Sequence, residues 1–343
     1  MKHTEKFDSL QVFRGLAALG VVLHHSAIST EAFVEKVPDW LYPLFAHGFL
    51  GVDFFFVLSG FIIMTSHYND EKSVASLKSY VIKRFVRIFP PYWPVSISVI
   101  IGYFLLPEMS QGPRGEFSLI SSLLLLPDSA PPALSVAWTL IHEMMFYIIF
   151  CLYFISKRLF IIFVIGWSLA ICIMAWLGEG ATTSPLMLRL FNPINLEFVL
   201  GICVAYLTRS SSNRDGTALA FLGISSIVLL LIWPFALECR ILFGLPFSAL
   251  VLGGVFLERQ GKLALPPLMV LMGDASYSIY LIHNPLLSLT SRIVGRSLGF
   301  SSWWWGLFAG AVSSVIAGTL YHLFIEKPLI RMFRHRINLM RSA

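Results

Sequence analysis

The sequence has little charge. Asp, Glu, Lys and Arg make up 13% of its 343 residues, whereas hydrophobic residues make up 57%. Soluble globular domains carry about 25% charged residues. This deficit, together with a mean hydropathy of +0.76, excludes an ordinary soluble protein and predicts an integral membrane protein. Because apolar segments extend from one end of the chain to the other, they leave no stretch for a sizeable soluble domain.

Paired cysteine motifs are also missing. The four cysteines stand singly in apolar segments: Cys151, Cys172, Cys203 and Cys239. Metal sites and redox motifs place cysteines in closely spaced pairs, so we expect packing residues and no bound metal. A cleavable signal peptide is not expected, because Arg14, His24 and His25 interrupt the first apolar run and no small-x-small cleavage site follows it. The sequence has no convincing internal repeat.

The chain does have apolar segments long enough to cross a bilayer, which takes about 20 residues per helix. Their periodicity predicts an all-α polytopic membrane helix bundle with about ten transmembrane helices. We expect these helices at residues 10–28, 48–66, 92–107, 136–155, 159–178, 192–207, 217–235, 241–257, 267–290 and 303–326. The apolar segment 117–126 is too short to span, and we expect it to be interfacial or re-entrant. One membrane domain is predicted over residues 1–343.

The distribution of lysine and arginine predicts the orientation, because cytoplasmic loops are enriched in both. With the N-terminus inside, six of the 25 Lys and Arg residues fall on the outer side: Lys36, Arg114, Arg189, Arg240, Arg292 and Arg296. The remaining 19 fall on the cytoplasmic side. We therefore expect both termini in the cytoplasm and a location in the cell inner membrane. The net charge of +6 follows from this topology, so no nucleic-acid partner is expected.

Ionisable residues inside the predicted spans mark functional positions, because they are costly in a bilayer. Arg14 and His25 are eleven residues apart, which is about 16 Å and three helical turns, so their side chains return to nearly the same face. His24 points about 80° away from that face. Depth along the spans groups His25 with a candidate outer layer of ionisable residues: Asp53, Glu143, Glu197 and His283.

A second layer is expected at the cytoplasmic boundary. Arg84 and Arg87 precede the 92–107 span there, and Glu326 ends the last span, level with Arg14. Arginine binds phosphate bidentately and stays charged at every relevant pH, whereas a neutral histidine deeper in the membrane suits proton abstraction. A ligand with an anionic head in the cytoplasm and a reactive end carried outward fits both layers. Acyl-CoA thioesters have this shape.

These residues lie in motifs that resemble the integral-membrane acyltransferase family 3, and the resemblance covers nearly the whole chain. The motifs, in order, are Arg14 and His25 with ten residues between them; GVDFFFVLSGFII at 51–63; Arg84 and Arg87 followed by PPYW; WTLIHEMMFY at 138–147; GDASYSIYLIHNP at 273–285; and EKP at 326–328. Most are loose individually, but six in this order are specific. The family transfers acyl groups, often acetyl, from cytoplasmic acyl-CoA to extracytoplasmic sugars.

The resemblance implies a role for each matching residue. His25 matches the essential histidine and Arg14 its partner, while Arg84 and Arg87 match the arginine motif of the cytoplasmic donor side. Glu326 matches an acidic residue that similar proteins need. Many relatives carry a soluble esterase-like domain after the last span. Here 17 residues follow position 326, so no fused domain of that kind is expected.

Two carboxylates allow both a functional and a structural interpretation. Glu143 shares a helical face with Tyr147, and it either positions His25 or the acceptor hydroxyl, or accepts a hydrogen bond that stabilises the bundle. Asp53 either orients His25 or belongs to a helix that packs closely through small residues such as Gly60. Both carboxylates are candidate catalytic residues.

The donor and acceptor sites are also predicted from residue type. Arg84 and Arg87 either bind acyl-CoA or, as is usual for cytoplasmic arginines, set orientation and contact lipid headgroups. Polar and aromatic side chains expected at the acceptor are Trp138, Tyr147, Tyr280 and His283.

The leading hypothesis is transfer of a short acyl group, expected to be acetyl, from cytoplasmic acyl-CoA to a hydroxyl of an extracytoplasmic glycan. The glycan would be a surface polysaccharide, exopolysaccharide, O-antigen or lipid-linked precursor, and polysaccharide-assembly proteins are candidate partners. His25 serves either as general base or as acyl carrier. One rival is a transporter or flippase, since intramembrane charges also mark translocation paths. The other is a non-catalytic scaffold.

Overall fold

The computed structural model describes residues 7–105, 117–178, 182–210, 215–233, 239–297 and 302–342. Four of the lysines and arginines from which the orientation was predicted lie outside these described residues: Lys2, Lys6, Arg114 and Arg214. The side chains of Arg296, Arg336 and Arg341 are likewise not described. The structure is 83% helical, and the described residues contain no strand. The all-α prediction is therefore confirmed.

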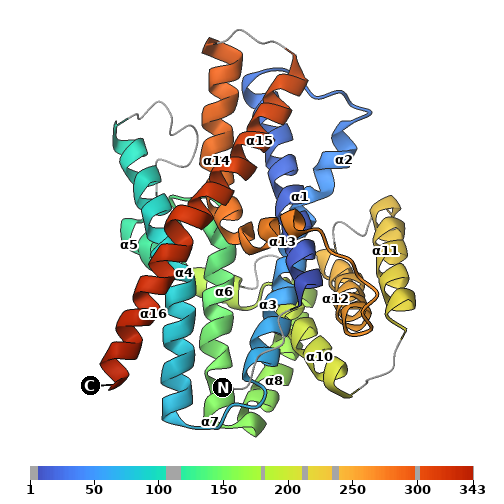
Figure 1. Ribbon diagram of the computed structural model, residues 1–343, viewed down its shortest axis with the longest axis vertical. Helices are drawn as coiled ribbons and strands as arrows, with labels where there is room; N and C mark the ends of the chain where they lie inside the picture. The colour runs from blue at the N-terminus through green and yellow to red at the C-terminus, as the bar shows by residue number, and fades with distance from the viewer. Residues whose placement is uncertain are drawn as a thin grey trace. The chain divides into compact units, whose positions relative to one another are not determined.

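The helices run from α1 near the N-terminus to α16 near the C-terminus (Figure 1). Their bounds are α1 Asp8–Phe33, α2 Tyr42–Ala46, α3 Gly51–His67, α4 Val74–Leu105, α5 Leu119–Leu124, α6 Ala137–Phe150, α7 Leu152–Ile155, α8 Lys157–Leu177, α9 Pro185–Leu190, α10 Asn195–Ser210, α11 Gly216–Ile232, α12 Gly244–Arg259, α13 Pro267–Asp274, α14 Ser276–Arg292, α15 Trp303–Tyr321 and α16 Lys327–Ser342. A π-helix, His322–Glu326, joins α15 to α16.

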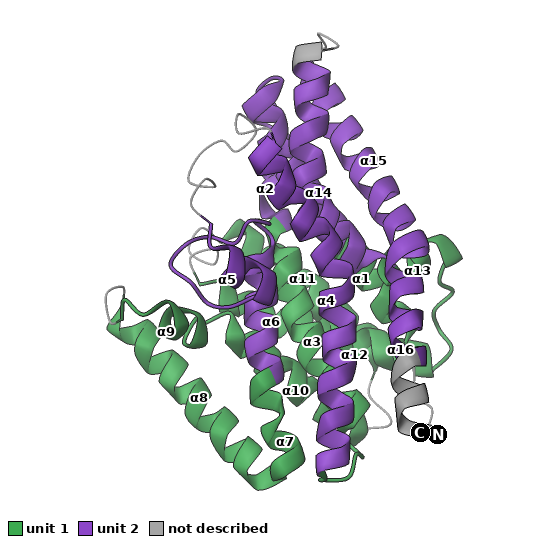
Figure 2. Ribbon diagram, turned by 90° about the vertical axis from the view of Figure 1, so that its left-hand side faces the viewer, with its two compact units in different colours: residues 1–17, 49–73, 148–274 green, residues 18–48, 74–147, 275–343 purple. Residues whose placement is uncertain are grey.

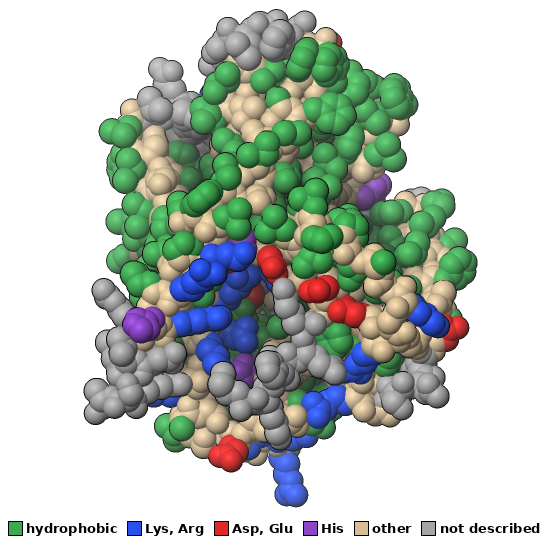
Figure 3. Space-filling view, viewed as in Figure 1, with side chains coloured by type: hydrophobic (Ala, Val, Ile, Leu, Met, Phe, Trp, Pro, Cys, Tyr) green, Lys and Arg blue, Asp and Glu red, His purple; other side chains and the backbone are tan. Residues whose placement is uncertain are grey.

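The lengths and composition of these helices are those of a membrane protein. In the described part of the chain, eight helices or directly joined helix groups are long and apolar enough to cross a bilayer. Hydrophobic side chains cover much of the visible surface over α14 and α15 (Figure 3). Such an extended apolar surface is stable against lipid and unstable against water. The chain is a multi-pass membrane protein.

Helix α4 differs from the prediction in a way that concerns the site. It begins at Val74, whereas the sequence predicted a span from residue 92. Arg84 and Arg87 therefore lie inside a helix and do not precede one, which corrects the sequence interpretation. The predicted start followed Pro90 and Pro91, because proline inside a helix removes a backbone hydrogen bond.

Hydroxyl groups from other helices bond to the backbone of α4 beside its prolines. The Tyr321 hydroxyl donates to the carbonyl oxygen of Pro91 at 2.7 Å, and the Tyr277 hydroxyl donates to that of Ile88 at 3.0 Å. A proline leaves the carbonyl four residues before it without a helical N–H donor, so these two bonds anchor α4 to its neighbours and do not replace the bonds lost at its prolines.

Of two other predicted segments, one differs from the structure and one agrees with it. The single span expected at 267–290 is divided at Ala275 into α13 and α14. The apolar segment 117–126 contains only the six-residue helix α5, whose length agrees with a segment that does not span.

The chain forms two compact units (Figure 2). Unit 1 comprises residues 1–17, 49–73 and 148–274, and unit 2 comprises residues 18–48, 74–147 and 275–343. In unit 1, α3 and α10 approach closely at Gly60 and Gly201. A methyl group on Gly60 would lie 2.1 Å from the carbonyl oxygen of Phe198, so only glycine permits this approach. The close packing expected around Gly60 is thus present.

In unit 2, serine hydroxyls fix the second half of α1 against α14 and α15. Ser26 donates to the carbonyl oxygen of Leu307 on α15 at 2.8 Å, and Ser29 donates to that of Leu287 on α14 at 3.2 Å. Small polar residues allow membrane helices to approach and hydrogen-bond across their interface. These contacts lie just after His25 on the same helix and hold this part of α1 beside α14 and α15.

Candidate active site

His25 and His283 are neighbours in unit 2. His25 Nδ1 lies 3.3 Å from His283 Nε2 and 3.0 Å from the carbonyl oxygen of Val21. The two ring centroids are 5.0 Å apart. The side chain of His283 is fully buried, whereas His25 is partly exposed. The structure therefore brings together two predicted site residues that are 258 positions apart in the sequence.

Tyr280 and Thr139 lie next to the histidine pair. The carbonyl oxygen of Tyr280 lies 2.7 Å from His283 Nδ1, and the Tyr280 hydroxyl lies 3.0 Å from Thr139 Oγ1. Trp138, also on α6, packs edge to face against His142 with ring centroids 5.8 Å apart. Two of the predicted acceptor residues, Tyr280 and His283, thus lie next to each other.

Glu326 is the centre of a second polar cluster in unit 2. Its Oε1 lies 2.6 Å from Arg87 Nη1. Its Oε2 accepts a hydrogen bond from the Ser278 hydroxyl at 2.7 Å and lies 2.7 Å from His322 Nδ1. The Glu326 side chain is 1% exposed and that of Arg87 is 31% exposed. A buried carboxylate is stable only with such partners, so these contacts hold Glu326 in place and leave part of Arg87 accessible.

Arg84 lies one turn before Arg87 on α4 and is surrounded by aromatic faces. Its guanidinium carbon is 5.6 Å from the ring centroid of Tyr80 and 5.5 Å from that of Tyr147, within cation–π range. The Tyr147 hydroxyl donates a hydrogen bond to Glu143.

These contacts define an arginine cluster in unit 2, formed by Arg84, Arg87, Glu143, Tyr147 and Glu326. Depth along the spans had grouped Glu143 with His25, and the acceptor set had included Tyr147; the contacts described here place both beside Arg84. Lysine and arginine side chains gather on the surface over α4 and α16 (Figure 3). The cluster therefore combines positive charge with rigid aromatic surfaces, which suits an anionic ligand that carries an aromatic ring.

Asp53 has a partner within unit 1. Arg240 Nε donates to Asp53 Oδ1 at 3.1 Å and Arg240 Nη2 donates to Oδ2 at 2.5 Å, which is the bidentate geometry of a strong ion pair. Asp53 is fully buried, and Glu197 on α10 of the same unit is also fully buried. The Arg240 contact gives the buried Asp53 side chain a cationic partner. Its expected role in orienting His25 stays a prediction.

Arg14 belongs to the part of α1 that lies in unit 1. Its Nη1 donates to Gln11 Oε1, one turn earlier, at 3.1 Å. Helix α1 is continuous from Asp8 to Phe33, so the helical rise between Arg14 and His25 that the sequence predicted is present.

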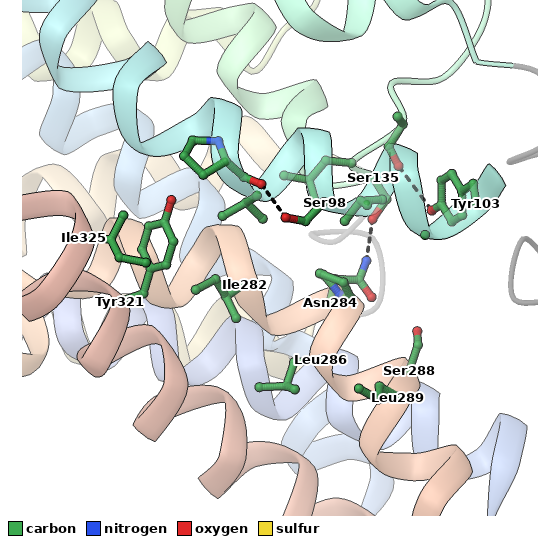
Figure 4. A pocket seen from close by; sticks show the side chains of 17 residues that line it. Ser98, Tyr103, Ser135, Ile282, Asn284, Leu286, Ser288, Leu289, Tyr321 and Ile325 are labelled. Atoms are coloured by element: carbon green, nitrogen blue, oxygen red, sulfur yellow. Dashed lines mark hydrogen bonds between the residues drawn. The ribbon is translucent and has the colours of Figure 1, made fainter. Parts of the chain in front are cut away.

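A groove of about 500 Å³ runs along α14 in unit 2, within the size range of ligand pockets (Figure 4). Its lining is largely apolar, with Ile282 and Leu286 on α14 and Ile325 near α16. Its polar side chains come from α4, α14, α15 and the segment before α6: Ser98, Tyr103, Ser135, Asn284, Ser288 and Tyr321. Four hydrogen bonds engage most of them, from Ser98 to Pro94 O, Tyr103 to Ala133 O, Asn284 to Ser135 and Tyr321 to Pro91 O.

Comparison with known proteins shows the family. A family profile described as an acyltransferase domain matches residues 7–323. The chain belongs to this acyltransferase family. The matched region of the acyltransferase includes Arg14, His25, Arg84 and Arg87, and it ends just before Glu326. Membership confirms the expectation of an acyltransferase enzyme that rested on six sequence motifs.

Several relatives of the acyltransferase align over most of its length. Exopolysaccharide production protein ExoZ of Rhizobium meliloti is 30% identical over 313 residues, which cover 85% of this chain and 92% of ExoZ. Acyltransferase MdmB of Streptomyces mycarofaciens is 26% identical over 96% of this chain and 93% of its own length. Peptidoglycan O-acetyltransferase OatA of Listeria monocytogenes is 26% identical over 96% of this chain, but over only 57% of OatA. No solved structure matches.

Several polar contacts in the acyltransferase were not predicted from its sequence. Arg240 as the partner of Asp53 left no signal, because the two residues are 187 positions apart. His322 did leave one, since it stands four positions before Glu326, the spacing at which side chains on a helix meet. Ser278 stands two positions before Tyr280 in a motif that the resemblance had singled out.

Proposed function

We propose that this acyltransferase moves a short acyl group, acetyl in the simplest case, from cytoplasmic acyl-CoA to a hydroxyl of an extracytoplasmic glycan. The observation that carries the proposal is the contact between His25 and His283, in a chain that belongs to an acyltransferase family. A partly exposed histidine held by a fully buried one supplies a basic nitrogen with a fixed orientation, which is what acyl transfer to a hydroxyl needs.

As a general base, His25 takes the proton of the acceptor hydroxyl while the acceptor oxygen attacks the thioester carbonyl carbon. The new bond is the ester C–O bond, and the bond that breaks is the C–S bond of the thioester. The proton then passes from the imidazolium to the coenzyme A thiolate. His25 is returned to its starting state, and the products are an acylated glycan and free coenzyme A.

As an acyl carrier, His25 attacks the thioester carbonyl itself and forms an acyl-imidazole with release of coenzyme A. The acceptor oxygen then attacks the acyl carbon, the C–N bond to the imidazole breaks, and the hydroxyl proton neutralises the thiolate released in the first step. This route lets donor and acceptor react in succession. The two routes differ in whether acetylated protein accumulates when the acceptor is withheld, so a labelled His25 in that condition identifies the second.

The donor site is proposed at the arginine cluster. Arg84 and Arg87 supply guanidinium groups for the phosphates of coenzyme A. Arg87 has five N–H donors, so one bond to Glu326 leaves others for a second anion. Glu326 is proposed to act by holding Arg87, and the faces of Tyr80 and Tyr147 beside Arg84 suit the adenine ring.

The proposed acceptor is a glycan, and its lipid-linked form fits one feature of unit 2. The names of ExoZ and OatA refer to exopolysaccharide and to peptidoglycan, which supports a carbohydrate acceptor. The groove along α14 suits the hydrocarbon part of a lipid-linked glycan, because its lining is largely apolar and most of its polar groups bond to the protein. Asn284 in this groove directly follows His283 in the chain.

The proposed location is the inner membrane, with ten crossings and both termini in the cytoplasm. The support is the distribution of lysine and arginine, since 19 of 25 fall on one side of the predicted topology. Cysteine accessibility tests it. Single cysteines placed at Lys157 and at Arg189 in a cysteine-free chain should react with a membrane-impermeant maleimide from opposite sides.

A substitution of His25 with a matched neighbour tests the central role. Membranes that contain His25→Ala should incorporate no label from radiolabelled acetyl-CoA into the glycan fraction, whereas those with His24→Ala should retain most of the wild-type rate. His24 is a stringent control because it is on the same helix and its ring packs edge to face against that of His25, with centroids 5.1 Å apart, while its Nδ1 lies 3.1 Å from the carbonyl oxygen of Phe45. Full activity of His25→Ala would refute the proposal.

The rival functions make different predictions. A carrier in proteoliposomes would move an unmodified solute, whereas the proposed enzyme transfers label from acetyl-CoA to an acceptor. A scaffold would support normal glycan modification with both Arg14 and His25 replaced. Membership of an acyltransferase family favours the enzyme over both.

A further inference from the structure

We infer that His283 is a positioning residue that fixes the tautomer of His25 and thereby makes His25 Nε2 the reactive nitrogen. This inference rests on the proposed function of His25 and adds a second residue to it. It also revises the sequence interpretation of His283 as part of the acceptor site.

His283 carries its hydrogen on Nδ1. Its Nδ1 lies 2.7 Å from the carbonyl oxygen of Tyr280. A carbonyl oxygen only accepts hydrogen bonds, so the hydrogen between these atoms belongs to His283 Nδ1. A neutral imidazole carries one N–H, and Nε2 of His283 is then an acceptor. Because His283 is fully buried, the neutral form is the one that its surroundings favour.

His25 also carries its hydrogen on Nδ1. His25 Nδ1 lies 3.0 Å from the carbonyl oxygen of Val21 and 3.3 Å from His283 Nε2. Both of these atoms are acceptors, so the contact is favourable only if His25 Nδ1 carries a hydrogen and shares it between them. The carbonyl contacts of Val21 on α1 and Tyr280 on α14 therefore agree that both histidines carry their hydrogen on Nδ1. The lone pair of neutral His25 is on Nε2.

The contact between His25 and His283 strengthens when the His25 ring becomes charged. When His25 Nε2 accepts the hydroxyl proton, or an acyl group, the ring becomes cationic and the Nδ1–H bond to His283 becomes charge-assisted. The neutral imidazole of His283 thus stabilises the intermediate state without placing a carboxylate beside it. An aspartate performs this orienting role in Ser-His-Asp triads. Both ring nitrogens of His283 are engaged, by Tyr280 and by His25, so this geometry directs His283 toward His25 and not toward the acceptor.

A pair of amide substitutions tests the inference. His283→Gln places an amide oxygen near the position of Nε2, where it can accept from His25 Nδ1, whereas the amide of His283→Asn is one methylene shorter and does not reach. Acyl transfer is measured with radiolabelled acetyl-CoA and native membranes as acceptor source. His283→Asn should lower kcat roughly 100-fold, because His25 in the wrong tautomer loses a contribution of the size that general-base catalysis makes. His283→Gln should stay within about tenfold of wild type, since it retains the acceptor. KM for acetyl-CoA should be unchanged in both.

A spectroscopic measurement reads the tautomer directly. The full chain labelled with ¹⁵N-histidine in detergent micelles should show His25 with a protonated Nδ1 and an unprotonated Nε2, and His283→Asn should change this pattern. The His25 signals are assigned by their loss in His25→Gln. Thermal unfolding of each variant shows whether the fold is retained.

The outcomes separate this inference from the proposed function. If His25→Ala is inactive and the asparagine and glutamine variants of His283 have equal activity, the positioning role is overturned while the function of His25 stands. An Nε2–H tautomer of His25 in the wild-type spectrum also overturns it. If His25→Ala is fully active, the proposed function fails, and the spectrum still decides whether His283 sets the tautomer.

Discussion

Arg87 on α4 and Glu326 at the end of the π-helix form an ion pair with 2.6 Å between Nη1 and Oε1, although they are 239 positions apart. The carboxylate is buried, and the guanidinium is partly exposed. The buried Glu326 carboxylate therefore holds Arg87 in place, while the partly exposed guanidinium of Arg87 can still contact a ligand. Stability and donor binding thus depend on the same two side chains and must be separated experimentally.

A double substitution separates them. Arg87→Leu alone leaves the buried carboxylate of Glu326 without its cation and should lower the free energy of unfolding by roughly 3 kcal/mol. Adding Glu326→Gln should restore part of the lost stability, because it removes the buried charge and keeps a side-chain oxygen for Ser278 and His322. Thermal unfolding in detergent measures both effects. Acyl transfer should stay low in the double variant, and recovery of transfer together with stability would contradict a donor-site role for Arg87.

Arg84 should affect the donor and not the fold. Arg84→Gln removes a charged hydrogen-bond donor from the arginine cluster, so KM for acetyl-CoA should rise about tenfold, which corresponds to one charge-assisted hydrogen bond. The neighbouring Lys83 is exposed, and Lys83→Gln should leave KM within about twofold, as expected of a solvated surface charge. Steady-state kinetics with varied acetyl-CoA make the comparison. Equal effects at both positions would indicate nonspecific attraction of the anionic donor.

The Asp53 pair should be mainly structural in unit 1. Arg240→Leu leaves a fully buried carboxylate without its cation and should lower the free energy of unfolding by about 3 kcal/mol. Replacing Asp53 by Asn in that background should recover part of the loss, since it removes the buried charge. Unfolding temperatures of the single and double variants test this. If Asp53→Asn retains its unfolding temperature and loses kcat, Asp53 acts on the reaction instead, as its sequence motif suggested.

Filling the groove along α14 should slow transfer to a lipid-linked acceptor. Leu286→Trp places a larger ring in the groove and should reduce the initial rate several-fold, because a hydrocarbon chain and the indole compete for the same volume. The matched control is Ile316→Trp on α15, where the side chain is already 54% exposed. Both rates are measured with native membranes at saturating acetyl-CoA. Equal rates for the two variants would exclude the groove from acceptor binding.

The sequence by itself determined the class of this protein. Hydropathy, charge and helix length are local properties, so the chain could be identified as an all-α membrane protein before its structure was known. Helical geometry related Arg14 to His25 for the same reason, since both lie on α1. The order of short motifs predicted the acyltransferase family, which the match over residues 7–323 confirms.

Only the tertiary structure decided which polar groups meet. His283 is the neighbour of His25, Glu326 of Arg87 and Arg240 of Asp53, and each pair is separated by at least 187 positions. The same holds for α4, which continues through its prolines within the bundle and is anchored there by hydroxyls of Tyr277 and Tyr321. Side-chain packing between helices sets which faces touch and at what height, and packing is a property of the whole bundle that no single span encodes.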